Sequence, residues 1–164
     1  MKLKKTVMAA LFAALTCVAT FVIRIPISFG YINLGDCMVL LSGWFLGPVY
    51  AFLSAGIGSA IADISSGYII YAPVTFLIKG IMALVGYYLF KAAGKKSQLT
   101  GNIISGLIAE IIMVGGYYIF EGFMYGFGGA LASLPANAVQ GIAGIIGACL
   151  LYLVFKKHLI KIIE

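Results

Sequence analysis

Long apolar stretches alternate along this chain with short segments that carry charges, prolines or glycines. A helix that crosses a bilayer needs about 20 apolar residues, so the pattern predicts membrane-spanning helices. Proline interrupts helix at and before its own position, so breaks are expected at Pro26 and at Gly47-Pro48. The predicted helices are residues 4–23, 36–46, 49–66, 73–90, 101–120 and 135–156.

The second predicted helix is the shortest. Residues 36–46 extend only about 16 Å at 1.5 Å per residue. The span is therefore either short and tilted or continued through a kink, and two helices are preferred because 49–66 is long enough to return across the membrane. Asp36 is expected to cap this helix. Loops are expected at 27–35, which is aromatic and should fold back onto the protein, at 91–100 and at the glycine-rich residues 121–132.

The first 24 residues also resemble a signal peptide, with lysines followed by an apolar run. The run is long enough for a spanning helix and no clear cleavage site follows it, so a retained first span is expected.

Composition supports a membrane protein, because 63% of the 164 residues are hydrophobic and 10% are charged, against about 25% charged in soluble domains. The expected fold class is an all-α integral membrane protein, a single transmembrane domain over residues 1–164 that forms a compact bundle of six helices.

The net charge of +6 is not spread as in nucleic-acid-binding proteins. It comes mostly from three lysine clusters, Lys2/Lys4/Lys5, Lys91/Lys95/Lys96 and Lys156/Lys157/Lys161. Six spans place all three on one side, so both termini are expected to be cytoplasmic, in the plasma membrane of a prokaryote.

No motif predicts an enzyme. Cys17, Cys37 and Cys149 are far apart and lack metal-ligand spacing. Nucleotide-binding, zinc-protease and serine-hydrolase motifs are missing from the sequence. The sequence therefore predicts no catalytic residues, no metal and no cofactor.

Four charged residues fall within or at the edge of predicted spans, Asp63, Lys79, Glu110 and Glu121. Charges there cost about 2.5–3.5 kcal/mol each, so such residues usually face a cavity or each other. Glu110, Val114, Tyr117 and Glu121 share one helical stripe, and Asn137 and Gln140 share another. With Asn33 and several tyrosines, these polar groups lie in the outer half of the predicted bundle. Aromatic walls with a few polar groups are typical of a pocket for a small polar ring.

A purely structural interpretation is the alternative. Lys79 would then only neutralise Asp63 or Glu110. A ligand site is favoured for Lys79, Glu121, Asn137 and Gln140, because polar groups inside a membrane are usually functional. For Asp63 and Glu110 the ligand-site and the structural interpretation are equally favoured.

Several motifs of the sequence stand out together. They are Asn33-Leu-Gly-Asp36, Gly43-Trp-Phe-Leu-Gly-Pro-Val-Tyr50, Gly56-Ile-Gly-Ser-Ala-Ile-Ala-Asp63, Tyr71-Ala-Pro-Val-Thr-Phe-Leu-Ile-Lys79 and Pro135-Ala-Asn137-Ala-Val-Gln140. In combination they resemble one group of S components, the substrate-binding subunits of energy-coupling factor (ECF) transporters. The resemblance covers roughly residues 5 to 155 and is greatest to members for pyridoxine (vitamin B6) or hydroxymethylpyrimidine, a thiamine precursor.

The resemblance implies a vitamin site near the outer surface, closed by the first loop. It also implies membrane lipid, a transmembrane coupling (T) subunit and two cytoplasmic ATPase subunits as partners, with no ATPase activity in this chain. The residues expected to bind the vitamin are Asn33, Tyr71, Lys79, Tyr117, Glu121, Asn137 and Gln140. Asn137 and Gln140 are expected to form hydrogen bonds with the ring nitrogen and hydroxyls of the vitamin. Lys79 is expected to pair with a ring-hydroxyl oxygen, and Glu121 to accept a hydrogen bond from a hydroxymethyl group.

The family docks on its coupling subunit through an A-x-x-x-A surface of the first helix. Here Ala9 with Ala13, or Ala10 with Ala14, fits that pattern. The alternatives to this function are an S component for another small vitamin and an autonomous channel or carrier for small solutes.

Overall fold

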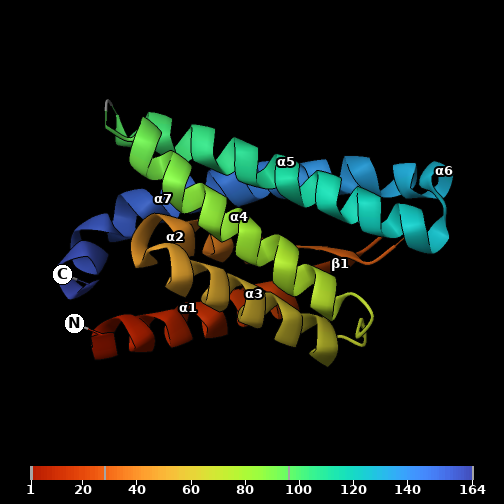
Figure 1. Cartoon of the computed structure of the whole chain (residues 1–164), viewed down its shortest axis with the longest axis horizontal. Coiled ribbons are helices and arrows are strands. Elements are labelled where there is room, and N and C mark those ends of the chain that lie inside the picture. The colour runs from red at the N-terminus through yellow and green to blue at the C-terminus, as the bar shows by residue number, and fades with distance from the viewer. Residues whose placement is uncertain (1, 28, 96, 164) are drawn as a thin grey trace.

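The computed structural model describes residues 2–27, 29–95 and 97–163, and in these ranges the chain forms six principal helices (Figure 1). They are α1 (Lys2–Val22), α2 (Gly35–Leu46), α3 (Pro48–Ser65), α4 (Ala72–Ala93), α5 (Gln98–Tyr125) and α7 (Leu134–Ile163). A short helix α6 (Phe127–Ala130) and a 3-10 turn η1 (Leu131–Ser133) join α5 to α7. Strands β1 (Arg24–Pro26) and β2 (Tyr31–Asn33) form an antiparallel hairpin between α1 and α2, with Ile25 opposite Ile32.

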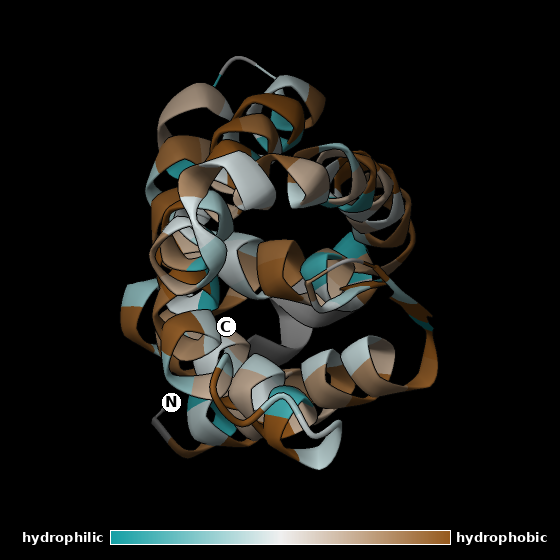
Figure 2. Cartoon of the chain, turned by 90° about the vertical axis from the view of Figure 1, so that its right-hand side faces the viewer, coloured by the Kyte–Doolittle hydropathy of each residue, from teal (hydrophilic) through white to brown (hydrophobic). Residues whose placement is uncertain are grey.

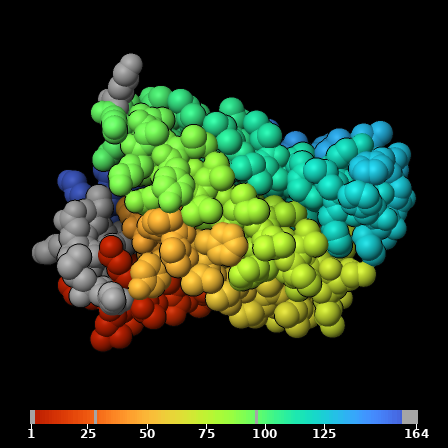
Figure 3. All heavy atoms as spheres, in the orientation of Figure 1, coloured from red at the N-terminus to blue at the C-terminus, as the bar shows by residue number. Residues whose placement is uncertain are grey.

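Helix α2 occupies the centre of the bundle, where it packs against α1, α3, α4 and α7. The start of α1 and the end of α7 lie together at one end, called here the terminal end (Figure 1). The hairpin and α6 lie toward the opposite end, called here the hairpin end. There α5 and α6 project beyond the ends of α3 and α4, as the space-filling view also shows (Figure 3).

The helices agree with the six predicted from the apolar pattern. Five segments of the described chain are long and apolar enough to cross a membrane. The second predicted span is a helix of 12 residues, about 18 Å long, which is shorter than a span requires. Most of its residues are buried by protein on all sides, so α2 does not need to match the thickness of the bilayer.

Three local expectations are wrong. Asp36 does not cap α2, because the helix already begins at Gly35, with Leu34 at the N-cap position and no side-chain cap hydrogen bond. The segment expected to be a loop at 27–35 contains the second strand of a β-hairpin, Tyr31–Asn33, and the first residue of α2, Gly35. Helix α5 continues to Tyr125, so Glu121 lies inside it, and most of 121–132 is helical. The glycines of this segment suggested a loop, but only Gly126 has a positive φ, and it is the residue that ends α5.

Hydrophobic side chains cover the outside of the bundle, in contrast to a soluble protein. Viewed from the hairpin end, hydrophobic residues occur on helices all around the structure (Figure 2). Exposed examples are Leu11, Val18, Leu53, Ile111 and Leu150. This surface is the one expected of a protein whose outer solvent is lipid.

Glycines allow neighbouring helices to approach closely. A Cβ built on Gly58 of α3 would lie 2.4 Å from the carbonyl oxygen of Ala13 in α1. Gly43 of α2 meets the carbonyl oxygen of Ala83 in α4 in the same way, at 2.7 Å. Gly86 of α4 is also buried and helical, but a Cβ there would meet nothing within 4 Å. The small residues therefore set the spacing of some helix pairs and not of others.

We expect Gly58→Ala to lower the free energy of unfolding by about 1–3 kcal/mol, because the added methyl group forces α1 and α3 apart. Gly86→Ala is the matched control and should raise it by about 0.5–1 kcal/mol, through the lower backbone entropy of alanine. Thermal unfolding of both variants in detergent measures the difference. Equal stability of the two variants would contradict this account of the α1–α3 contact.

Candidate functional site

A small cavity lies at the hairpin end, between the hairpin and the ends of four helices. Its lining residues come from the hairpin, α3, the α3–α4 connection and α4, α5 and α7, and are Phe29, Gly30, Tyr31, Asn33, Asp63, Tyr68, Tyr71, Thr75, Tyr117, Glu121, Asn137 and Gln140. Six of the seven residues expected from the sequence are among them, and Lys79 is the exception. Whether they contact a ligand stays a prediction.

The hairpin forms the roof of this cavity and is attached at several points. Tyr31 donates to Asp63 of α3 over 2.6 Å, and Tyr68 donates to the carbonyl oxygen of Gly30 over 3.4 Å. Phe29 stacks on Tyr125 at the end of α5, with ring centroids 4.5 Å apart. Burial, and then the charge of Asp63, raise the pKa of Tyr31 well above its usual value. Tyr31 therefore remains a neutral hydrogen-bond donor.

Two amides attach the hairpin to α7. The side-chain oxygen of Gln140 accepts from the backbone N–H of Asn33 at 2.9 Å and from its side-chain amide at 3.3 Å. The oxygen of the Asn33 side chain accepts from the N–H of Gly35 at 2.8 Å. Gln140 in turn donates to Asp36 over 2.6 Å. Each amide nitrogen uses one hydrogen in these bonds, so each retains one further N–H.

Lys79 lies behind this amide pair. It forms a buried ion pair with Asp36, and both side chains are almost completely excluded from the surface. Its partner is therefore neither of the carboxylates considered from the sequence, Asp63 and Glu110. The Lys79 ammonium group also lies 5.6 Å from the centre of the Tyr117 ring, which lines the cavity. Lys79 thus supports the cavity wall through Asp36, Gln140 and Tyr117.

Carboxylates and hydroxyls form the other side. Glu121 accepts from Tyr71 at 3.5 Å and from Ser133 in a short hydrogen bond. Thr75 and Tyr117 share a hydrogen bond of 3.0 Å. The amide nitrogen of Asn137 is buried and has no protein partner among the described residues. The cavity therefore presents donors at Asn33, Asn137 and Gln140, and acceptors at Asp63 and Glu121.

Glu110 is separate from this cavity, although it shares a helical stripe with Glu121. Both of its carboxylate oxygens are buried without a hydrogen-bond partner in the described chain. One of them would lie 3.0 Å from a Cβ on Gly144 of α7, beside Asp36. Asp63, by contrast, lines the cavity. The two carboxylates that the sequence left undecided are thus placed differently.

Among the other lining residues, Tyr31 and Tyr68 belong to the tyrosines expected in the outer half of the bundle, and their ring centroids lie 5.0 Å apart. Thr75 was not expected, although the sequence carries a signal for it. It lies between Tyr71 and Lys79 at intervals of four residues, which is one face of α4. Phe29 was not singled out either, because its place in the cavity depends on the fold of the hairpin.

Comparison with known proteins identifies similar chains over nearly the whole length. The family model described as ECF-type riboflavin transporter, S component, matches residues 1–157. A protein of Pyrococcus woesei, described as an uncharacterized protein in a gap 3' region, is 37% identical over 150 residues, which is 90% of this chain and 98% of that one. The thiamine precursor transporter HmpT of Lactococcus lactis subsp. cremoris (strain MG1363) is 31% identical over 148 residues, 88% of this chain and 82% of the relative.

One solved structure has the same fold. It was reported as the structure and mechanism of the S component of a bacterial ECF transporter, and it superposes with a TM-score of 0.74. The alignment covers 97% of this chain and 99% of that chain at 24% sequence identity.

We expect Lys79→Met to lower the free energy of unfolding by about 3–5 kcal/mol, because it leaves Asp36 buried without its cation. The double variant Asp36→Asn/Lys79→Met should recover part of this loss, since no unpaired charge remains and the new amide oxygen still accepts from Gln140. Thermal unfolding in detergent compares the two, with Lys157→Met as an exposed control. If the double variant were less stable than Lys79→Met alone, the unpaired charge of Asp36 could not be the cause of the lost stability.

Proposed function

Because the chain belongs to the family of ECF-type riboflavin transporter S components, we propose that it captures a small heteroaromatic vitamin or precursor for import, with hydroxymethylpyrimidine as the substrate. Family membership establishes an S component, a multi-pass membrane subunit of a vitamin transporter. The substrate is inferred from the cavity and from the similarity to HmpT.

The size of the cavity favours one ring. Its volume is about 40 Å³, which corresponds to roughly three water molecules at about 10–15 Å³ each. A single six-membered ring requires a modest outward movement of the hairpin. The three fused rings and polyol chain of riboflavin require far more space than these walls provide.

The positions of donors and acceptors favour an aminopyrimidine. The ring nitrogens of hydroxymethylpyrimidine accept hydrogen bonds and suit the free N–H groups of Asn33, Asn137 and Gln140. Its exocyclic amino and hydroxyl groups donate, and suit the carboxylates of Asp63 and Glu121. Pyridoxine has one ring nitrogen instead of two, so it offers one ring acceptor fewer to these amides, although its three hydroxyls can also donate to the carboxylates. The unpartnered amide of Asn137 is the observation that carries the proposal, because an unsatisfied buried donor is costly without a ligand.

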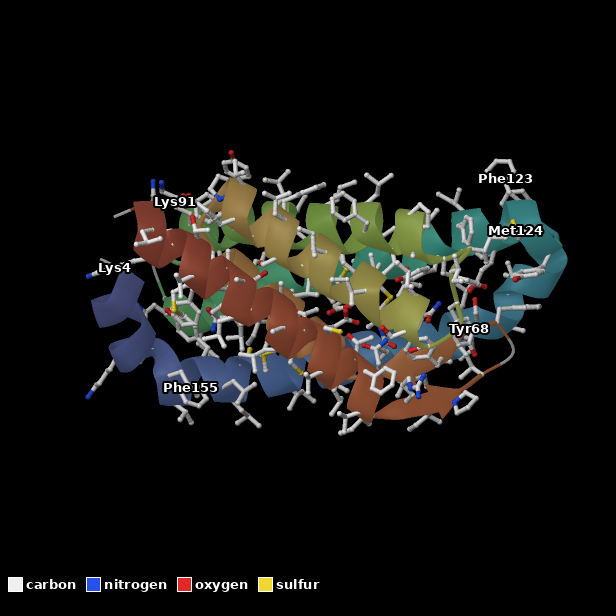
Figure 4. All side chains as sticks on the ribbon, turned by 90° about the horizontal axis from the view of Figure 1, so that it is seen from below. Lys4, Tyr68, Lys91, Phe123, Met124 and Phe155 are labelled. Carbon is white, nitrogen blue, oxygen red and sulfur yellow. The ribbon has the colours of Figure 1, made fainter. Side chains whose placement is uncertain are left out.

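The orientation in the membrane follows from the lysines. Lys4 and Lys91 lie at the terminal end, far from Tyr68 at the hairpin end (Figure 4). The positive-inside rule then places the terminal end and both termini in the cytoplasm, and the cavity toward the outside. The side chains of Lys2 and Lys161, and the whole of Lys96, lie outside the described residues.

The two alanine pairs of α1 differ in their burial. Ala9 packs against the hydrophobic core, and the carbonyl group of Ala13 packs on Gly58. Ala10 and Ala14 are exposed. Within the proposal, Ala10 and Ala14 form the flat surface that docks on the transmembrane coupling subunit, which recruits the two ATPases.

The first test is ligand identification. We expect the purified protein to release hydroxymethylpyrimidine for mass spectrometry and to bind it in calorimetry more tightly than pyridoxine or riboflavin. Asn137→Ala should weaken binding by at least about tenfold, as expected when about 1.4 kcal/mol of hydrogen bonding is lost. Asn102→Ala, a buried amide outside the cavity, should leave the affinity unchanged. If none of the three compounds binds and none is extracted, the substrate assignment fails.

The second test concerns docking. Ala10→Leu/Ala14→Leu should abolish co-purification with the coupling subunit, because the larger side chains prevent close helix approach. Substrate affinity should not change. Ala92→Leu, at an exposed position of α4, is the control and should still co-purify. If the α1 variant co-purified with the coupling subunit as well as the wild type does, the proposed role of Ala10 and Ala14 in docking would be wrong.

A further inference from the structure

A second hollow lies at the terminal end, far from the proposed vitamin cavity. It is a groove of about 340 Å³ between α2, α4, the start of α5 and α7. Four aromatic residues line it, Trp44, Phe45, Phe90 and Tyr152. The floor is formed by the rings of Trp44, Phe90 and Tyr152, with pairwise centroid distances of 5.7–5.9 Å. The floor is rigid, because the indole N–H of Trp44 donates to Ser105 over 2.9 Å and Tyr152 is buried.

Ammonium groups surround the edge of this groove. Lys91 and Lys95 line it directly, and both are exposed. Lys156 of α7 adds a third, because it donates to Gln98, another lining residue, over 3.4 Å. A basic edge above an aromatic floor is therefore contributed by α4, α7 and the α4–α5 connection.

These cations have no acidic partner nearby in the described chain. The sequence has five acidic residues, of which Asp36, Asp63, Glu110 and Glu121 are buried inside the bundle and do not line the groove, and Glu164 lies outside the described residues. Ammonium groups without a protein carboxylate attract an anion from the surroundings. For a membrane protein, the anion that is always present beside an apolar groove is the phosphate of a lipid headgroup.

We propose that this groove binds one anionic phospholipid, with its phosphodiester on Lys91 and Lys95 and an acyl chain over Trp44, Phe90 and Tyr152. A zwitterionic lipid is less suitable, because none of the described residues places a carboxylate at the groove to receive its cationic headgroup. A free phosphate satisfies the lysines and leaves the aromatic floor uncovered. The site is independent of the vitamin cavity, so each proposal can fail without the other.

Trp44 provides a direct readout, because it is the only tryptophan in the chain. We would titrate phosphatidylglycerol with brominated acyl chains into the protein in detergent and record quenching of Trp44 fluorescence. Saturable quenching is expected, with about tenfold weaker quenching by brominated phosphatidylcholine. Lys91→Gln/Lys95→Gln should weaken the effect of phosphatidylglycerol by about tenfold or more, since each lysine near a membrane surface contributes about 1 kcal/mol.

Lys4→Gln/Lys5→Gln removes the same charge from the same end and is the matched control. Its quenching curve should equal that of the wild type. If quenching weakened as much as in Lys91→Gln/Lys95→Gln, the lipid would be held by the general positive charge of this end and not by a site. Glycerophosphoglycerol, which lacks acyl chains, should not compete, and full competition would indicate a site for free phosphate compounds. Native mass spectrometry of the wild type tests retention of phosphatidylglycerol if the lysine variant does not fold. Quenching that is linear and equal for both lipids, or no retained lipid, overturns the proposal.

Discussion

The buried ion pair between Lys79 and Asp36 is the contact through which the polar groups of this bundle are organised. Each charge alone costs about 2.5–3.5 kcal/mol at membrane depth, so neither is stable there without the other. Asp36 also accepts from Gln140, which holds Asn33 of the hairpin. One interaction between α2 and α4 therefore positions α7 and the roof of the cavity.

The short central helix explains where the cavity is found. Helix α2 is shorter than a bilayer and is enclosed by its neighbours. The space beyond its first residue is occupied by the hairpin, which is attached by side-chain contacts and by few main-chain bonds outside its own ladder. A roof attached in this way can move without unfolding any helix, because the bonds that break are individually weak. The proposed vitamin cavity lies beneath this roof.

The sequence predicted the helices well, because apolar runs and prolines report directly on lipid contact and helix breaks. It did not predict the hairpin, whose three-residue strands depend on contacts with residues far along the chain. It also did not predict the partner of Lys79, since pairing with Asp36 depends on how α2 and α4 pack. The stripe from Glu110 to Glu121 was found, but eleven residues of helix extend about 16 Å, so its two ends cannot share a small cavity.

The unequal lengths of the helices have a consequence for the bilayer itself. Helix α3 has 18 residues and α5 has 28, so they extend about 27 Å and 42 Å respectively. Lipid beside α5 must stretch, or the helix must lean, while lipid beside α3 meets little mismatch. The protein therefore either imposes a gradient of thickness on the surrounding membrane or tilts in it, at a cost of fractions of a kcal/mol for each ångström. Changing the acyl-chain length of the lipid will change the angle at which the bundle is most stable.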